Sequence, residues 1–272
     1  MNDAGDPHRS LLPRMLARSR QNSSATFAII GRRFRVRPAL YGHISWWPWA
    51  AGIALLAAFA AAFLDQASVR NWHEIFGASG EILTQLGLGQ WYLWPAAGWL
   101  LVANQIDWAS LRREKLMAVY NRTCIAMFVL VGVGLPGLLN IVLKIVFGRA
   151  RPKLFAQEGA FSFHPGAVNA VYASFPSGHA TTMGSVAGVL VLLFPRAKYP
   201  ILALCMAITA TRVVVGAHYP SDTIVGFGMG FGLAVATGLV FARLGFLFRT
   251  MPAGLPVLKR TVWGSRRKTA LA

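Results

Sequence analysis

The sequence is poor in charged residues. Asp, Glu, Lys and Arg together make up 13% of the 272 residues, whereas hydrophobic residues make up 55%. Soluble globular domains carry about 25% charged residues. The composition therefore excludes an ordinary soluble protein and indicates a chain that lies in a membrane.

Cysteine is scarce too, and the chain begins without an apolar segment. Both cysteines, Cys124 and Cys205, fall in apolar runs, and their spacing is not that of a metal site. We therefore expect no disulfide framework. Because no apolar segment lies near the N-terminus, we also expect no ordinary cleaved signal peptide.

Long apolar runs, in contrast, are abundant. Six of them approach the length of about 20 residues that a bilayer-spanning helix needs. They are residues 45–64, 83–103, 123–143, 180–194, 201–216 and 223–241. We predict an all-α fold, a polytopic membrane bundle of six transmembrane helices at residues 46–248, between a basic N-terminal segment at 1–45 and a basic tail at 249–272.

Acidic residues are the rarer charged class. Nine Asp and Glu stand against 27 Lys and Arg, which gives a formal net charge of +18. Most basic residues fall in four segments on one side of the six-span chain: residues 1–45, 112–122, 196–198 and 243–268. By the positive-inside rule this side, with both termini, is cytoplasmic. The charge therefore reflects topology and contact with anionic lipid, and we expect no nucleic-acid partner.

A second set of basic residues lies on the opposite side, where positive charge should be scarce. An unpaired cation at membrane depth costs at least about 2.5 kcal/mol. Acidic residues in these segments are limited to Glu158 and Asp222, so a bound anion would balance the remaining charge. The cations are Lys144, Arg149, Arg151, Lys153 and Arg212.

Two helix boundaries are expected on this same side. Pro176 and Ser177 predict the start of the fourth span, which would point the free amides of Ser177, Gly178 and His179 outward. Pro220 breaks the helical pattern near residue 220, so that His218 would cap the fifth span and Asp222 would open the sixth. Lys144 and Arg151 are seven residues apart and would share a helical face if the helix continued, although Pro152 disfavours this.

Cations, two histidines, an aspartate and a helix N-terminus thus meet at one membrane face, which predicts a site for an anion such as phosphate. A metal site is the main chemical rival, because His179, His218 and Asp222 resemble a ligand set. The three neighbouring cations would repel a divalent ion, so we expect no metal.

These residues resemble the three-part signature of the type 2 phosphatidic acid phosphatase (PAP2) superfamily, which here covers residues 144–152, 176–179 and 211–222. Thr211 stands where the family has serine, and the hydroxyl is kept. The resemblance implies a bacterial membrane lipid phosphatase with a six-helix core and a site at the extracytoplasmic face.

The resemblance also implies a role for each residue. His218 would attack phosphorus to form a phosphohistidine, with Asp222 fixing its tautomer, and His179 would protonate the leaving oxygen and then activate water. No metal or other cofactor is implied. The phosphate-binding residues would be Lys144, Arg151, Ser177, Gly178 and Arg212.

The leading hypothesis is a metal-independent phosphatase that hydrolyses a lipid phosphate or diphosphate at the periplasmic face of the inner membrane. Polyprenyl diphosphates, lipid A phosphates and glycerophospholipid phosphates are all open as substrates, and so is the oligomeric state. The alternative is a lipid phosphotransferase that passes the phosphoryl group to a second lipid. An anion channel or transporter is disfavoured, because transport would not require the pair of His218 and Asp222.

The segment from residue 153 to residue 175 is too polar, and too rich in turn-forming residues, to be another span. Phe161, Phe163 and His164 would belong to a substrate-reading loop or to a structural loop at the membrane interface; the sequence favours neither. Arg149 and Lys153 flank the signature and would contact head groups or support the site residues.

Overall fold

The structure, a computed structural model, describes residues 7–36, 45–69, 82–249, 255–259 and 262. Helices account for most of these residues. The sheet in the described residues is a single antiparallel pair of strands, β1 (Phe248–Arg249) and β2 (Val257–Leu258). The predicted all-α class is confirmed.

Each of the six apolar runs contains a helix, as predicted. The six are α2 (Trp47–Phe63), α4 (Gln90–Gln105), α5 (Arg113–Phe147), α7 (Gly178–Leu193), α8 (Lys198–Val214) and α9 (Pro220–Arg243). Among the described residues, three helical segments are long and apolar enough to cross a membrane: Arg113–Phe147, Pro195–Val214 and Pro220–Arg243. The chain is therefore a helical membrane protein, and six as the number of spans stays a prediction.

Three of the expected spans have clearly different bounds. The second was expected to begin near residue 83, but α4 begins at Gln90, and residues 82–85 form a separate helical turn. The fifth was expected to reach residue 216, but α8 ends at Val214. The third is longer than expected, because the 35 residues of α5 extend about 52 Å, well beyond the bilayer core.

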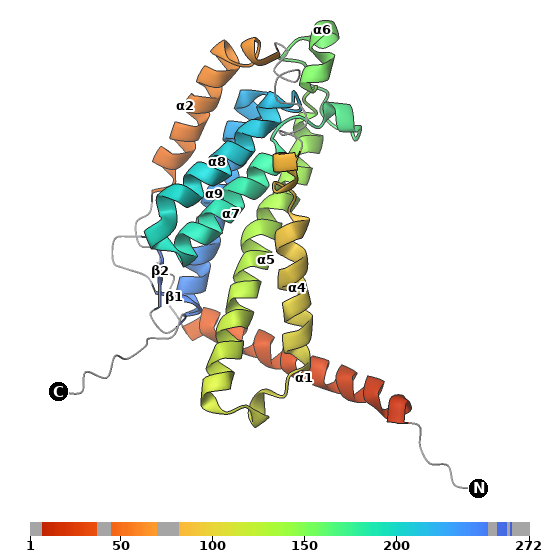
Figure 1. Cartoon of the computed structure of the whole chain (residues 1–272), viewed down its shortest axis with the longest axis vertical. Helices are drawn as coiled ribbons and strands as arrows, with labels where there is room; N and C mark the ends of the chain where they lie inside the picture. The colour runs from red at the N-terminus through yellow and green to blue at the C-terminus, as the bar shows by residue number, and fades with distance from the viewer. Residues whose placement is uncertain (1–6, 37–44, 70–81, 250–254, 260–261, 263–272) are drawn as a thin grey trace, which may run out of the picture.

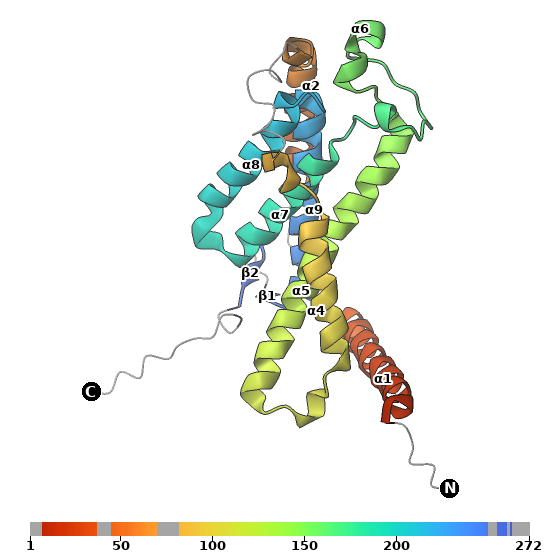
Figure 2. The same ribbon diagram turned by 45° about the vertical axis from the view of Figure 1, so that its right-hand side comes forward.

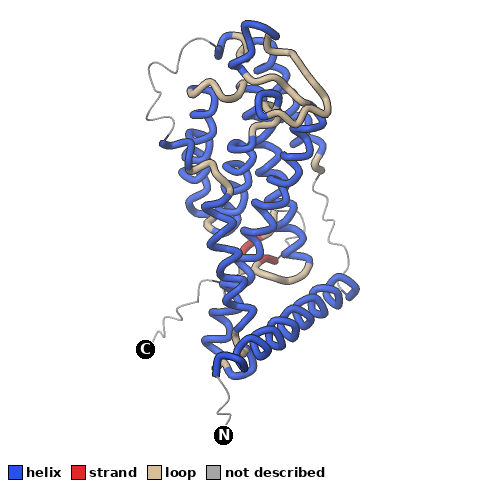
Figure 3. The backbone as a smooth tube through the Cα atoms, turned by 90° about the vertical axis from the view of Figure 1, so that its right-hand side faces the viewer, coloured by secondary structure: helices blue, strands red, loops and turns tan. Residues whose placement is uncertain are grey.

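The N-terminal basic segment contains a helix that the sequence did not predict, α1 (Pro7–Val36). It crosses the foot of the bundle at a steep angle to the other helices (Figure 3). Asn22 of α1 donates hydrogen bonds to the carbonyls of Asn104, at 2.8 Å, and Ile106, at 3.0 Å. These contacts fix α1 beside the C-terminal end of α4.

The centre of the bundle is the pair α7 and α9, which approach unusually closely. A side-chain carbon at Gly184 of α7 would collide with the carbonyl of Phe227, and one at Gly230 of α9 with the carbonyl of Thr181. Glycine at both positions therefore permits backbone contact. Around this pair lie α5 and α4 on one side and α8 and α2 on the other (Figures 1 and 2).

The two ends of the bundle differ in character. The short helix α6 (Phe155–Glu158) and its loop lie at the end opposite to α1 (Figure 1). The connection from α4 to α5, with Arg112 and Arg113, lies at the α1 end, as does the C-terminal end of α9 with Arg243. The structure thus separates a basic end from the end that holds the signature residues.

Candidate active site

The first signature segment turns sharply where α5 ends. Gly148 has a left-handed φ of 58°, and its amide donates to the carbonyl of Lys144 at 2.8 Å. A side-chain carbon at Gly148 would also collide with the carbonyl of His164. Arg151 is extended, with ψ 158°, so the helical face that would join it to Lys144 does not exist. The turn brings the two residues into the same site instead.

The second segment forms the N-terminus of α7. Ser177 is the N-cap residue, as its position before the apolar run predicts, and its hydroxyl accepts from the amide of Ala180 at 3.5 Å. The amide of Ser177 is not free, because it donates to the carbonyl of Asp222 at 3.1 Å. This part of the prediction is wrong. In the described part of the chain, no acceptor contacts the amides of Gly178 and His179, which remain available to an anion.

The first and second segments lie side by side. A carbon added to Gly178 would lie 3.7 Å from Nζ of Lys144. One turn earlier on α5, the buried Asn140 donates to the carbonyl of Pro176 at 3.1 Å and to the hydroxyl of Thr181 at 2.9 Å. Asn140 thus ties α5 to the start of α7. Nothing in its sequence context selects Asn140, because it stands alone in an apolar run.

The third segment is the connection between α8 and α9. His218 lies four residues beyond the end of α8, but its amide still donates to the carbonyl of Arg212, at 3.2 Å, and so caps the helix as expected. The ring is 2% exposed, and Nδ1 lies 3.7 Å from Oδ2 of Asp222. Burial lowers the pKa of His218 to about 4, so the ring is neutral at pH 7.

The predicted cations surround the two histidines. Electrostatic interactions link Lys144 with Arg151 and Arg212, and His179 with all three cations and with His218. The buried Nε atoms of Arg151 and Arg212 have no hydrogen-bond partner among the described residues. Converging cations with unsatisfied donors are the arrangement that an anionic group would complete.

A residue before α4 joins this site without having been predicted. Arg212 donates through Nη1 to the hydroxyl of Thr84 at 2.9 Å. Gly87 follows closely, and a side-chain carbon there would lie 2.8 Å from the ring of His179. The start of the second apolar run is therefore a wall of the site.

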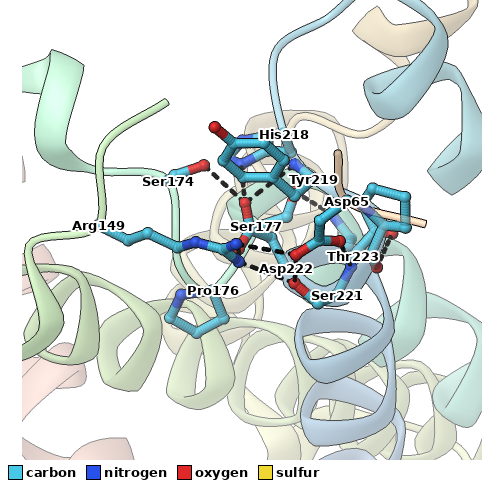
Figure 4. Close-up of polar contacts among 12 residues, drawn as sticks. Asp65, Arg149, Ser174, Pro176, Ser177, His218, Tyr219, Ser221, Asp222 and Thr223 are labelled. Atoms are coloured by element: carbon cyan, nitrogen blue, oxygen red, sulfur yellow. Dashed lines mark hydrogen bonds and ion pairs between the residues drawn. The ribbon is translucent and has the colours of Figure 1, made fainter. Parts of the chain in front are cut away.

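Arg149 is the largest omission from the predicted site. It is 3% exposed, and its guanidinium donates to Asp222 at 2.6 Å and to Asp65 at 2.8 Å. Both carboxylates are fully buried. Asp65 directly follows the first apolar run. The pairing of Asp65 with Arg149 could have been suspected from the sequence, because a cation at membrane depth needs an anion as its partner. Figure 4 shows the two carboxylates and the guanidinium meeting beneath His218 and Tyr219.

The loop after Arg151 folds against this arginine. Phe161 and Phe163 are about half exposed, and their ring centroids lie 5.9 and 5.8 Å from the guanidinium carbon of Arg149. His164 is engaged within the loop, since its Nε2 lies 2.8 Å from a carboxylate oxygen of Glu158. Phe161, Phe163 and His164 thus lie together in one loop, and their contact with substrate stays a prediction.

A groove with a volume of about 640 Å³ lies between α4, α5 and α7 and opens on the side of the bundle. Its lining is apolar except for the hydroxyl of Thr182, which stands one turn from His179 on α7. Ile141, one turn from Lys144 on α5, lines the same end. The groove therefore begins beneath the site. Its lining includes Leu93, Leu130, Gly134, Gly137, Leu138 and Ile141.

Metal ligation finds no support in the described residues, where no group of three or more His, Cys, Asp and Glu side chains is placed to hold an ion. His179, His218 and Asp222, the rival ligand set, lie among cations. The expected absence of a metal stays a prediction.

Comparison with known proteins gives matches at the level of sequence. A family model described as the PAP2 superfamily matches residues 125–245. A lipid A 1-phosphatase of Rhizobium johnstonii is 39% identical over 183 residues, which cover 66% of this chain and 74% of the relative. The protein of the same name from Rhizobium etli is also 39% identical over 183 residues, 66% of this chain and 78% of the relative.

A more distant match is an undecaprenyl-diphosphatase of Sulfolobus acidocaldarius. It is 32% identical over 108 residues, which cover 36% of this chain and 50% of that protein. No solved structure matches the chain.

Proposed function

The chain belongs to the PAP2 superfamily and is a membrane lipid phosphatase, and on this premise we propose that it removes the 1-phosphate of lipid A. The observation that carries a lipid phosphate as substrate is the apolar groove that begins beneath the cationic site. A phosphate held by Lys144, Arg151 and Arg212 would place the attached lipid beside His179, where the groove starts. The names of the two rhizobial relatives support lipid A over the other lipid phosphates.

The groove predicts a separation between lipid and soluble substrates. No atom lies within 4 Å of a carbon added at Gly137, so Gly137→Leu would extend into the groove without a clash at its first carbon. We expect kcat/KM on lipid A to fall by roughly 10-fold or more, since one leucine side chain occupies the volume of several methylenes of an acyl chain. Phosphate release from p-nitrophenyl phosphate should change less than about 2-fold, because that ester needs no groove.

Gly98→Leu is the matched control, because a carbon at Gly98 of α4 also meets nothing within 4 Å and the residue does not line the groove. An equal loss on both substrates in Gly137→Leu would mean that the groove does not hold the lipid. Failure of the wild-type protein to release phosphate from lipid A would reject that substrate instead.

The proposed reaction proceeds in two displacements at phosphorus. Nε2 of the neutral His218 attacks, the bond from phosphorus to the lipid oxygen breaks, and His179 donates a proton to that oxygen. Asp222, 3.7 Å from Nδ1, stabilises the positive charge that develops on the ring. Water then attacks the phosphohistidine, His179 accepts its proton, and inorganic phosphate leaves. The three cations and the amides of Gly178 and His179 would hold the phosphoryl oxygens.

The two histidines should respond differently to substitution. His218→Ala removes the nucleophile and should abolish turnover of every phosphate ester. His179→Asn removes proton donation, a contribution of about 10² to 10⁴ in rate that matters most for a basic leaving group. We therefore expect His179→Asn to lose far more activity on lipid A than on p-nitrophenyl phosphate, whose leaving group needs little protonation. Turnover of the aryl ester by His218→Ala, with none by His179→Asn, would reverse the two assignments.

The site is proposed to face the periplasm. The separation of a basic end from the signature end supports this orientation, because basic segments are retained in the cytoplasm. In this orientation, a lipid substrate would enter the site from the outer leaflet of the inner membrane.

Reporter fusions test the orientation directly. An alkaline phosphatase fusion near residue 165, in the loop at the signature end, should be active, and fusions after residues 115 and 197 should be inactive. The reverse pattern would place the site in the cytoplasm.

A further inference from the structure

Asp222 is held by more groups than a partner of His218 requires. Its Oδ1 accepts from Nη1 of Arg149 at 2.6 Å. Its Oδ2 accepts from the hydroxyl of Ser174, at 2.6 Å, and from the amide of Tyr219, at 3.0 Å. These bonds fix the plane of the carboxylate and leave Oδ2 facing Nδ1 of His218.

Arg149 is held in turn by Asp65, a residue outside the three signature segments. Oδ2 of Asp65 accepts from Nη2 of Arg149, at 2.8 Å, and from the hydroxyl of Ser221, at 2.6 Å, while Oδ1 accepts from the amide of Ser221 at 3.0 Å. The carbonyl of Ala160 accepts two more bonds from the guanidinium. Every donor nitrogen of Arg149 is therefore engaged (Figure 4).

The burial of this cluster makes its charges interdependent. Arg149, Asp65 and Asp222 are at most 3% exposed, and removal of one member of a buried ion pair leaves an uncompensated charge. With Asp65 neutral, the guanidinium would face Asp222 alone and would draw its negative charge away from His218. Arg149 would also lose the ion pair with Asp65 that keeps its guanidinium in place.

We propose that Asp65 and Arg149 are positioning residues for the reaction. They orient Asp222 and balance its charge, so that its Oδ2 stabilises the ring of His218 during phosphoryl transfer. This inference rests on the proposed function, and it extends the machinery from the signature segments to the end of α2.

The test compares Asp65→Asn with wild type on p-nitrophenyl phosphate. We expect kcat to fall by about 10- to 100-fold, because misplacement of a group that acts in the transition state costs rate. KM should stay within about 3-fold, since Asp65 does not contact the phosphate. Ser221→Ala removes the hydroxyl that donates to Asp65 and accepts from Nη1 of Arg149, but it keeps the amide bond to Asp65. It should give a smaller loss in kcat of the same kind. The control is Ser185→Ala, at a buried serine whose hydroxyl donates to the carbonyl of Thr181 within α7, and it should keep wild-type kcat.

A double-mutant cycle separates positioning from a merely structural role. If Asp65 acts through Asp222, Asp65→Asn should lower kcat little further in an Asp222→Asn background. The low rates are measured as release of radiolabelled phosphate from the ester. Wild-type kcat in folded Asp65→Asn, or full additivity in the cycle, would overturn the proposal. If Asp65→Asn does not fold, Ser221→Ala decides, and its wild-type kcat would overturn it. Activity of the wild-type protein tests the proposed function separately.

A second inference concerns α1, whose exposed surface is divided into two stripes. Leu12, Leu16, Ser19, Ser23, Phe27, Ile30 and Phe34 follow one another at steps of three or four residues and share one side of the helix. We call this set the apolar stripe. Arg14, Gln21, Ala28, Arg32 and Arg35 form the opposite stripe.

The apolar stripe contacts the bundle at Ser19 and again at Phe34, whose ring centroid lies 5.1 Å from the guanidinium carbon of Arg243. Ser19 accepts from Nδ2 of Asn104 at 3.1 Å and from Nε2 of Gln105 at 2.6 Å, both at the end of α4. Leu16 is 53% exposed and Phe27 is 74% exposed. Leu16 and Phe27 therefore present apolar surface that the described part of the bundle leaves exposed. Most of the bundle lies on one side of α1 (Figure 3).

We propose that Leu16 and Phe27 are inserted in the interface of a bilayer that contains anionic lipid. The bundle rises from this side of α1, so a membrane around the bundle would meet the apolar stripe and leave the opposite stripe in water. Arginines of α1 and the basic residues at the same end of the bundle would attract anionic head groups.

Spin labels on the full-length chain test this placement. In a background with alanine at the two buried cysteines, Cys124 and Cys205, labels at Leu16→Cys and Phe27→Cys are compared with labels at Gln21→Cys and Ala28→Cys. The measured quantity is the ratio of accessibility to oxygen, which concentrates in lipid, to accessibility to a water-soluble nickel complex. In phosphatidylcholine vesicles with phosphatidylglycerol, this ratio should be several-fold higher for the first pair of labels than for the second. The contrast should shrink without phosphatidylglycerol. Equal accessibility at all four positions, or dipolar broadening at Phe27→Cys from a second copy, would overturn the proposal.

Discussion

A bilayer cannot solvate an unpaired charge, and this constraint organises the site end of the molecule. Arg149 satisfies it with two buried carboxylates, Asp65 and Asp222. The nearby cations Lys144, Arg151 and Arg212 are not paired in this way. The Nε atoms of Arg151 and Arg212 are buried without a hydrogen-bond partner in the described part of the chain. The same rule thus separates the paired cation Arg149 from the cations that would hold the phosphate in the proposed reaction.

The separation also explains how Asp222 can serve His218. A carboxylate among four cations would be held by the nearest one and lost to the histidine. Asp65 supplies a second negative charge, so that Arg149 is neutralised on one side while it orients Asp222 on the other. The groove beneath His179 completes the proposed arrangement, because it would give the lipid a path on the side of the proposed acid.

Much of the site could be predicted from the sequence, because each signature residue had a local reason to be there. Ser177 caps α7, and His218 and Asp222 flank the helix break at Pro220, as their positions indicate. The pairing of Asp65 with Arg149 could not be predicted, since it joins residues 84 apart and depends on how α2 packs against α9. The start of α4 was misplaced for a related reason: residues 82–89 have nearly the hydropathy of a span, but Thr84 and Gly87 are committed to the site.

The central claim is that phosphate passes through His218. The most direct measurement is to mix the protein with radiolabelled lipid A 1-phosphate, quench the reaction within one turnover and map the label. The account predicts a phosphoprotein that is labile to acid and stable to alkali, with the label on the peptide that contains His218. Label at His179 or on a hydroxyl residue, or phosphate release without any labelled protein in a quench fast enough to capture the first turnover, would contradict it.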